Sequence, residues 1–344
     1  MSPRRAANRL RARLGAGLAA LSLAVIATGC AAGASTPERV SIVATTNILG
    51  DVTSQIVGDA AEVTTLMQPN ADPHSFEISA QQAAAMDRAS LVVSNGLGLE
   101  EGLQQHLDRV AAAGGSQFIA GAHVRVLDYG ATPAAAAGTD DGRPLVEQSG
   151  VTAAPDPHFW TDPQQMIAVV RALTAEVSSL PALSAGARAA ITKRGTDYLA
   201  ELAALDDTLT AELDRVPQDR RALVTNHHVF GYFAARYDFR ILGTAIPGGT
   251  TLAAPSAADL SDLVRAITEA GVPTIFAESS APDRLMRVLA AEAGIEVRVV
   301  PLFTESLTPP GGGAATYIDM LTENTTRIVD GLAPPADQPH PHHQ

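Results

Sequence analysis

The sequence predicts an α/β protein made of two lobes with parallel-type sheets, joined by one long rigid helix. Three features of the 344-residue chain predict this fold. Short β-rich runs alternate with helical patterns near the amino end, a second such series fills the last third, and a long helical pattern lies between them. Alternation of this kind is typical of parallel βα units.

The first lobe is expected to span residues 39–183. Its β-rich runs and helical patterns alternate at 40–44, 48–57, 62–67, 80–88 and 91–94. Near its end, residues 130–155 are rich in Ala, Gly, Thr and Asp and show no apolar period, so we expect a mobile surface loop there.

The second lobe is expected to span residues 217–332. It repeats the alternation, with strand-like runs at 222–225, 239–243, 274–277 and 296–300 and helical patterns at 256–270 and 283–293. Between the lobes, residues 184–216 contain no proline and carry leucines at helical spacing. One continuous helix there would be about 50 Å long. Two ordinary helices with a break near Gly195 are the alternative.

The amino end has the layout of an export signal. Five arginines precede an apolar run over residues 14–26, which is too short for a confident membrane span, and small residues then lead to Cys30. Because Cys30 is the only cysteine, it has no intramolecular disulfide partner. The small residues before it resemble a lipoprotein signal-peptidase site. We therefore expect a lipoprotein signal peptide over 1–29, lipidation of Cys30 and a tether over 30–38; an ordinary signal peptide with a chance cysteine is the alternative.

Charge and targeting restrict the partners. Removing residues 1–29 deletes five arginines and no acidic residue, which leaves 19 basic and 37 acidic side chains and a net charge of −18. This balance excludes nucleic acid as a probable partner. The predicted location is extracytoplasmic, on the periplasmic or cell-surface side, with the cell membrane contacted through the lipid. The Pro-rich tail 333–344 is expected to be disordered, although its histidines are also able to collect metal.

Three of the nine histidines lie in unusual local contexts. His74 and His158 each follow Asp-Pro, and proline restricts both its own φ and the residue before it, so each imidazole is carried by a stiff loop. His227 follows a predicted strand, where the carboxyl ends of parallel strands meet a ligand crevice. The three imidazoles are therefore able to converge on an interlobe cleft. His106, in a predicted helix, and His123, before a strand-like segment, are expected to be surface or packing residues.

Several segments in a fixed order resemble the cluster A-I family of ABC-transporter solute-binding proteins, the zinc and manganese receptors. Two of them contain the Asp-Pro-His motifs, and a third contains Asn226-His227-His228 followed by Val-Phe-Gly-Tyr-Phe. The matching segments lie between Val40 and Val329, at residues 43–46, 67–77, 95–100, 156–163 and 225–237. The resemblance implies two lobes joined by one long helix, with a metal in the interlobe cleft.

The resemblance also implies the ligands, one from each of four loops. By position these are His74, His158 and His227, while His228 stays outside because adjacent side chains on an extended segment point apart. The fourth ligand in relatives is usually an aspartate, and here Glu305 stands in the matching segment. Glu278 is a competing carboxylate, which we expect instead to support a ligand or shape its loop.

Three neutral imidazoles and one carboxylate suit Zn(II), whereas Mn(II) prefers more oxygen and a higher coordination number. Manganese-type relatives commonly carry a carboxylate where this chain has His227. The expected function is therefore capture of Zn(II) as a transported ligand and its delivery to an ABC import permease. A metallochaperone is a possible partner, and we expect a monomer. A Mn(II) receptor of the same family is the alternative.

Two other functional classes compete with transport. A zinc hydrolase also uses histidine ligands, but no His-Glu-x-x-His pair occurs and a carboxylate fills the fourth position, so we expect no enzyme. A metal-dependent surface adhesin is a minor alternative, because the composition provides no separate adhesive module.

Overall fold

The structure is a computed structural model that describes residues 39–129 and 154–333. The predicted signal peptide, Cys30, the tether, most of the loop expected at 130–155 and the tail beyond Ala333 lie outside the described residues. In the described part of the chain, no helix has both the length and the apolar character that crossing a membrane requires.

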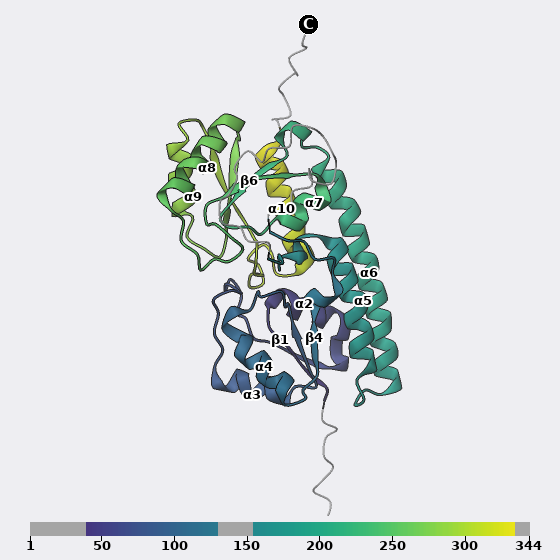
Figure 1. The fold of residues 1–344 in the computed structure, drawn as a ribbon. Helices are drawn as coiled ribbons and strands as arrows, with labels where there is room; N and C mark the ends of the chain where they lie inside the picture. Colours follow the sequence, from purple (N-terminus) through teal and green to yellow (C-terminus); the bar gives the residue numbers. More distant parts are fainter. Residues whose placement is uncertain (1–38, 130–153, 334–344) are drawn as a thin grey trace, which may run out of the picture. The chain divides into compact units, whose positions relative to one another are not determined.

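The first lobe is built on a four-stranded parallel sheet in the order β2-β1-β3-β4 (Figure 1). Its strands are β1 (Ser41–Ala44), β2 (Glu62–Thr65), β3 (Leu91–Ser94) and β4 (Gln117–Ile119). The connecting helices are α2 (Asn47–Val57), α3 (Ala80–Arg88) and α4 (Gln104–Ala112), with 3-10 turns at Gly58–Ala60, Glu101–Leu103 and Ala120–His123. The inner strand β3 is buried along its whole length, as a parallel strand covered on both faces should be.

The second lobe contains two parallel strand pairs, β5-β6 and β7-β8. The strands are β5 (Ala222–Thr225), β6 (Arg240–Thr244), β7 (Thr274–Glu278) and β8 (Arg298–Leu302). The helices are α7 (Gly231–Tyr237), α8 (Ala257–Ala270), α9 (Arg284–Glu292) and α10 (Tyr317–Leu332), and a 3-10 turn covers Gln218–Arg220. Helix α8 has strong end signals, because Ser256 and Asp259 form a capping box and Gly271 ends the helix in the left-handed region.

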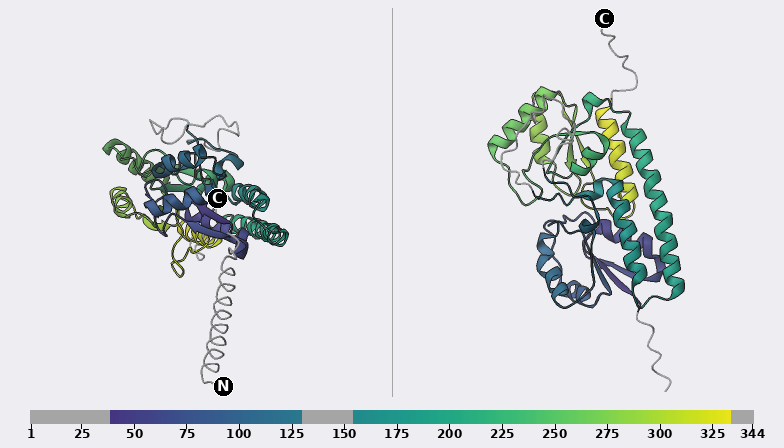
Figure 2. Two further views of the ribbon diagram at one scale, coloured as in Figure 1. Left: turned by 90° about the horizontal axis from the view of Figure 1, so that it is seen from below. Right: turned by 45° about the vertical axis from the view of Figure 1, so that its right-hand side comes forward.

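Two long helices run side by side along one side of both lobes (Figures 1 and 2). They are α5 (Pro163–Ser179), which a 3-10 turn at Phe159–Thr161 precedes, and α6 (Ala185–Leu213). Helix α6 is continuous over 29 residues, a length of about 44 Å. Gly195 does not break it. An added Cβ at Gly195 would lie 2.4 Å from Thr174 Oγ1 of α5, so glycine at this position permits the close approach of the two helices.

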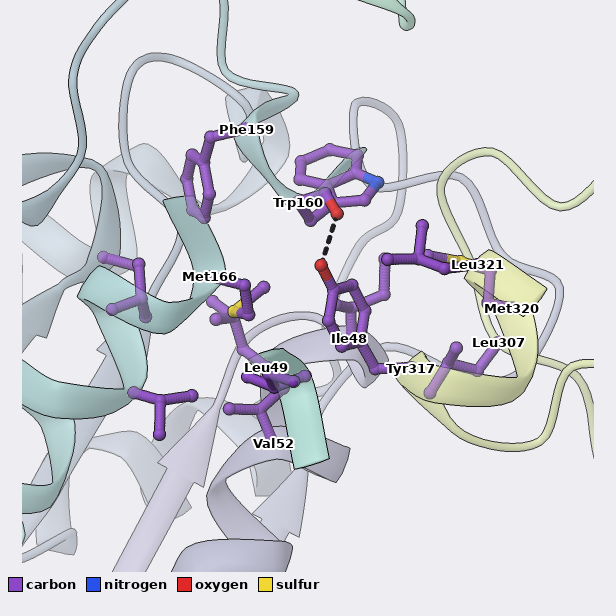
Figure 3. Close-up of a cluster of buried hydrophobic side chains, with 14 of the residues drawn as sticks. Ile48, Leu49, Val52, Phe159, Trp160, Met166, Leu307, Tyr317, Met320 and Leu321 are labelled. Atoms are coloured by element: carbon purple, nitrogen blue, oxygen red, sulfur yellow. Dashed lines mark hydrogen bonds between the residues drawn. The ribbon is translucent and has the colours of Figure 1, made fainter. Parts of the chain in front are cut away.

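An apolar cluster fills the space where the lobes meet (Figure 3). Helix α2 of the first lobe contributes Ile48, Leu49 and Val52, and α10 of the second contributes Tyr317, Met320 and Leu321. Trp160 lies between them, and Tyr317 Oη donates a hydrogen bond to the Trp160 carbonyl at 2.7 Å. Because both lobes bury side chains in one cluster, separating the lobes would expose apolar surface. This exposure costs a free energy of about 25 cal/mol for each Å².

The predicted α/β fold of two lobes is confirmed, and the strands and helices predicted from the sequence have ends within three residues of the observed ones. The sequence patterns did not predict β4, α5, α7 or α10. A strand after His123 was wrongly expected: the only pairing there among the described residues is an isolated antiparallel bridge between Asp128 and Pro155. The domain boundaries at 39–183, 184–216 and 217–332 stay predictions.

Replacing Gly195 by alanine tests the close packing of α5 and α6. Alanine normally stabilises a helix interior by about 0.5–1 kcal/mol relative to glycine. Here the new methyl group would overlap Thr174, so we expect Gly195→Ala to lower the free energy of unfolding by about 1–3 kcal/mol. Gly186→Ala in the same helix is the control, because its Cβ would meet only Ser184 Oγ at 3.9 Å. Urea unfolding that found Gly195→Ala as stable as Gly186→Ala would contradict the packing argument.

Candidate metal site

The two Asp-Pro-His motifs form similar turns at the cleft. Asp72 Oδ1 accepts the His74 backbone N–H at 2.8 Å, and Asp156 Oδ1 accepts the His158 backbone N–H at 2.9 Å. Aspartate commonly stabilises a turn in this way, by bonding to the backbone two residues further on. Each aspartate, together with the rigid proline, therefore fixes the direction in which its histidine leaves the chain.

The other two candidate ligands follow strands of the second lobe. His227 lies two residues after β5, and its carbonyl accepts a hydrogen bond from Thr225 Oγ1 at 2.8 Å. Glu305 lies three residues after β8. Both positions are at the carboxyl ends of parallel strands, where α/β sheets place their ligands.

The Glu305 loop belongs to the second lobe but is held by the first. Asn47 Nδ2 donates to Ser306 Oγ at 2.7 Å, and Asn47 Oδ1 accepts the Leu307 N–H at 2.9 Å. The Trp160 indole N–H donates to the Thr304 carbonyl at 2.8 Å. The second-lobe loop that carries Glu305 is therefore held in place by side chains of the first lobe.

The structure brings all four predicted ligands together. His74, His158, His227 and Glu305 are buried, each with 2% exposure or less, and one donor atom from each lies within 4.8 Å of the others. Glu305 Oε1 lies 3.0 Å from His74 Nε2, 3.2 Å from His227 Nε2 and 3.4 Å from His158 Nε2. His158 Nε2 is also 3.4 Å from Nε2 of both His74 and His227.

The donor atoms point at a shared centre rather than at one another. Neither carboxylate oxygen of Glu305 makes a hydrogen bond to any part of the chain that the structure describes, although three imidazole nitrogens lie within 3.4 Å. A buried ionised group without partners is costly, at about 1–3 kcal/mol or more. A bound cation would satisfy both the carboxylate and the nitrogen lone pairs, so these residues fit a metal ion.

Carboxylates contact two of the three imidazoles at Nδ1, the ring nitrogen that faces away from the shared centre. Asp156 Oδ1 lies 2.7 Å from His158 Nδ1, and Glu278 makes a short contact with His227 Nδ1. A carboxylate at Nδ1 fixes the tautomer that leaves Nε2 free for a metal and raises the basicity of the ligand. Glu278 thus supports His227 and does not compete with Glu305 for the centre. Asp156 was not identified as an acceptor from the sequence, although its place two residues before His158 is the signal that would have found it.

The charges in the cluster shift its protonation strongly. Burial alone would lower the pKa of His227, but Glu305 and Glu278 more than offset this effect and raise that pKa well above its usual value. Burial alone would raise the pKa of Glu305, but the charge of His227 and contacts with the three imidazoles hold it well below its usual range.

The histidines expected to have no ligand role lie outside the cluster. His228 points toward Tyr129, with ring centroids 5.9 Å apart, and burial lowers its pKa. His123 stacks on Phe118 at 4.7 Å, and His106 lies in α4. The tail histidines are outside the described residues.

An open cleft of about 260 Å³ leads to the cluster from the His74 side. The first lobe lines it with residues that include Glu101 and Tyr129, and the second lobe with Gly248, Gly249 and Thr250. His74 is the only one of the four candidate ligands among the residues that line this cleft. Among the described residues, this cleft therefore borders the site at His74.

Two parallel α/β lobes with a buried three-histidine, one-carboxylate cluster between them define a class, the two-lobed binding proteins for metal cations. Residues 42–331 match the model of the family described as "Zinc-uptake complex component A periplasmic", and the chain belongs to this family. The family predicted from the sequence motifs is confirmed.

The relatives carry names for two metals. The chain is 27% identical over 315 residues to the manganese-binding lipoprotein MntA of Halalkalibacterium halodurans, a match that covers 90% of this chain and 96% of that protein. It is 28% identical over 297 residues to the zinc-binding protein TroA of Treponema pallidum, covering 85% and 88%. The solved structure of TroA superposes with a TM-score of 0.73 at 26% identity and covers 86% of this chain and 100% of TroA.

The general function follows from the family. The chain is a substrate-binding protein of a metal ABC transporter, which binds a divalent metal and delivers it to the permease. Its metal is cargo and not a catalytic cofactor, so the protein is not an enzyme.

Glu278→Gln tests the support of His227. The glutamine keeps the shape but loses the charge, so we expect zinc binding to weaken by about 10–100-fold. Competition with a chelator of known affinity measures the change. Glu292→Gln, an exposed carboxamide substitution on α9, is the control and should stay within about twofold of the wild type. Equal affinities for the two variants would show that Glu278 does not act on the metal.

Proposed function

We propose that this protein is a zinc receptor, which captures Zn(II) outside the cytoplasm with Nε2 of His74, His158 and His227 and the carboxylate of Glu305, and passes it to an ABC import permease. The observation that carries the choice of zinc is the spacing of the donor atoms. The edge of a regular tetrahedron is about 1.63 times the distance from centre to corner, so Zn bonds of about 2.0–2.1 Å require donor atoms about 3.3–3.4 Å apart. Five of the six separations among these atoms are 3.0–3.4 Å, which agrees with this requirement, and all four atoms lie within 4.8 Å of one another.

Manganese is the second candidate, and one observation favours it. The second carboxylate oxygen of Glu305 has no hydrogen-bond partner among the described residues, so the side chain is able to give two donors and raise the coordination number. The relationship to MntA also points to this metal. Zinc binds more tightly than manganese at most sites of this kind, so affinity alone does not separate the two cargoes.

The coordination number and the metal carried in the cell separate the candidates. X-ray absorption of the loaded protein should show four N/O donors at about 2.0–2.2 Å, and protein purified without chelators should contain zinc. His227→Ala should weaken zinc binding by more than about 100-fold, because losing a ligand reduces the affinity more than losing the Glu278 carboxylate that supports this ligand. His123→Ala, which changes an exposed imidazole outside the cluster, is the control. Manganese in the purified protein, bound by five or six donors, would decide for the second candidate.

We also propose that Cys30 carries the lipid that holds the receptor at the membrane. The support is its position after small residues and an apolar run, together with relatives that are named as lipoproteins. The tether would then be residues 30–38.

Cys30→Ser tests the anchor. In a bacterial host that processes lipoproteins, we expect the wild type to incorporate labelled fatty acid and remain with the membranes, and the variant to lose both properties. The variant should still bind one equivalent of zinc, because Cys30 is far in sequence from the ligands. A wild type that carries no label and leaves the membrane would exclude lipidation.

A further inference from the structure

The three imidazoles are unequally supported. His158 and His227 each have a carboxylate in contact with Nδ1, but Nδ1 of His74 is buried and makes no hydrogen bond to the described residues. If Nε2 of His74 binds a metal, its proton must lie on Nδ1, where it requires an acceptor. His74 is therefore the ligand whose support is incomplete.

One carboxylate is placed to supply it. Glu101 Oε1 lies 3.9 Å from His74 Nδ1, which is about 1 Å too far for a hydrogen bond. The Glu101 side chain is 47% exposed and lines the cleft, so a change of rotamer would close the gap without moving the backbone. No comparable freedom exists at Asp156 or Glu278, whose side chains are almost fully buried.

Glu101 is meanwhile bound to the opposite lobe. Thr250 Oγ1 donates to the same atom, Glu101 Oε1, at 2.9 Å. The next residue, Thr251, donates to Asp72 Oδ2 at 2.6 Å, and Asp72 is the residue that fixes the His74 backbone. Two adjacent threonines of the second lobe thus contact both the carboxylate nearest the His74 imidazole and the turn that carries His74.

The segment around these threonines is held by few contacts. Tyr129 Oη donates to the Gly249 carbonyl at 2.9 Å, and the His228 N–H donates to the Gly248 carbonyl at 3.4 Å. An added Cβ at Gly249 would overlap the Tyr129 ring, so the segment packs closely against the cleft wall at this point. Leu252, just beyond the threonines, is 58% exposed.

We propose that Glu101 is the positioning residue of His74 and that its carboxylate accepts a hydrogen bond from the His74 Nδ1–H when metal is bound. Thr250 of the opposite lobe, which bonds to the same carboxylate, controls whether Glu101 is available for this hydrogen bond. His74 is then the ligand that leaves first, on the side of the open cleft. The two lobes influence metal release through a hydrogen bond to a carboxylate, without a change in the ligands themselves. This inference rests on the proposed receptor function, because it concerns the same four ligands.

The rate of zinc dissociation tests the role of Glu101. Zinc-loaded protein is mixed with excess chelator in a stopped-flow instrument. We expect Glu101→Gln to release zinc about 10-fold faster, because the glutamine amide is a weaker hydrogen-bond acceptor than the carboxylate. This is the lower end of the effect of losing a carboxylate that supports a metal-binding histidine. Glu77→Gln, an exposed substitution three residues from His74 that removes the same charge, should release zinc at the wild-type rate within about twofold. Nitrogen-15 NMR of the loaded protein should show faster solvent exchange of the His74 Nδ1 proton in Glu101→Gln, with those of His158 and His227 unchanged.

A double-mutant cycle tests the role of Thr250. Thr250→Val should change the dissociation rate when Glu101 is present and have no effect in the Glu101→Gln background, because Thr250 acts only through that carboxylate. Independent effects of the two substitutions would overturn the coupling. Equal release from Glu101→Gln and Glu77→Gln would overturn the positioning role, while wild-type protein that binds no zinc would instead overturn the receptor function.

Discussion

The structure depends on one electrostatic constraint, which is that a carboxylate and three imidazole nitrogens share a buried centre. Lone pairs 3.4 Å apart repel one another unless a proton or a metal ion lies between them. Holding such a group together requires support from outside the cluster, and Asp156, Glu278 and Asn47 provide it. These contacts keep four donors close enough for one cation.

The anchoring of Glu305 limits how the lobes move. Its loop is bonded to Asn47 and Trp160, and the apolar cluster around Tyr317 contains side chains of both lobes. The long helix α6 adds a rigid connection along one side. Wide opening of the lobes would disrupt the first two of these connections and bend the third, which favours local movement of the loops at the cleft over a hinge between the lobes.

The sequence predicted the ligands better than what supports them. His74, His158, His227 and Glu305 follow turn or strand signals that restrict the backbone, and their chemistry is visible in the residue type. Glu278 was expected to support a ligand or shape its loop, but the ligand that it contacts depends on how β5 lies beside β7, which no local pattern records. Glu101 and Thr250 gave no signal, since an exposed glutamate and a threonine in a loop are common everywhere. Strand β4 was missed because three residues are too few to show alternation.

The same supports bear on the choice of metal. Asp156 and Glu278 add negative charge next to Nδ1 of two imidazoles. Negative charge attracts any divalent cation, so it does not make the site prefer zinc over manganese. Geometry separates them: manganese requires more donors, and the only further protein donor at this centre in the described chain is the second oxygen of Glu305. Because Asn47 fixes the loop that carries Glu305, any higher coordination number would depend on this carboxylate and not on movement of the loop. If zinc is the cargo, as proposed, the loop that Asn47 holds contributes to selectivity together with the identity of the ligands.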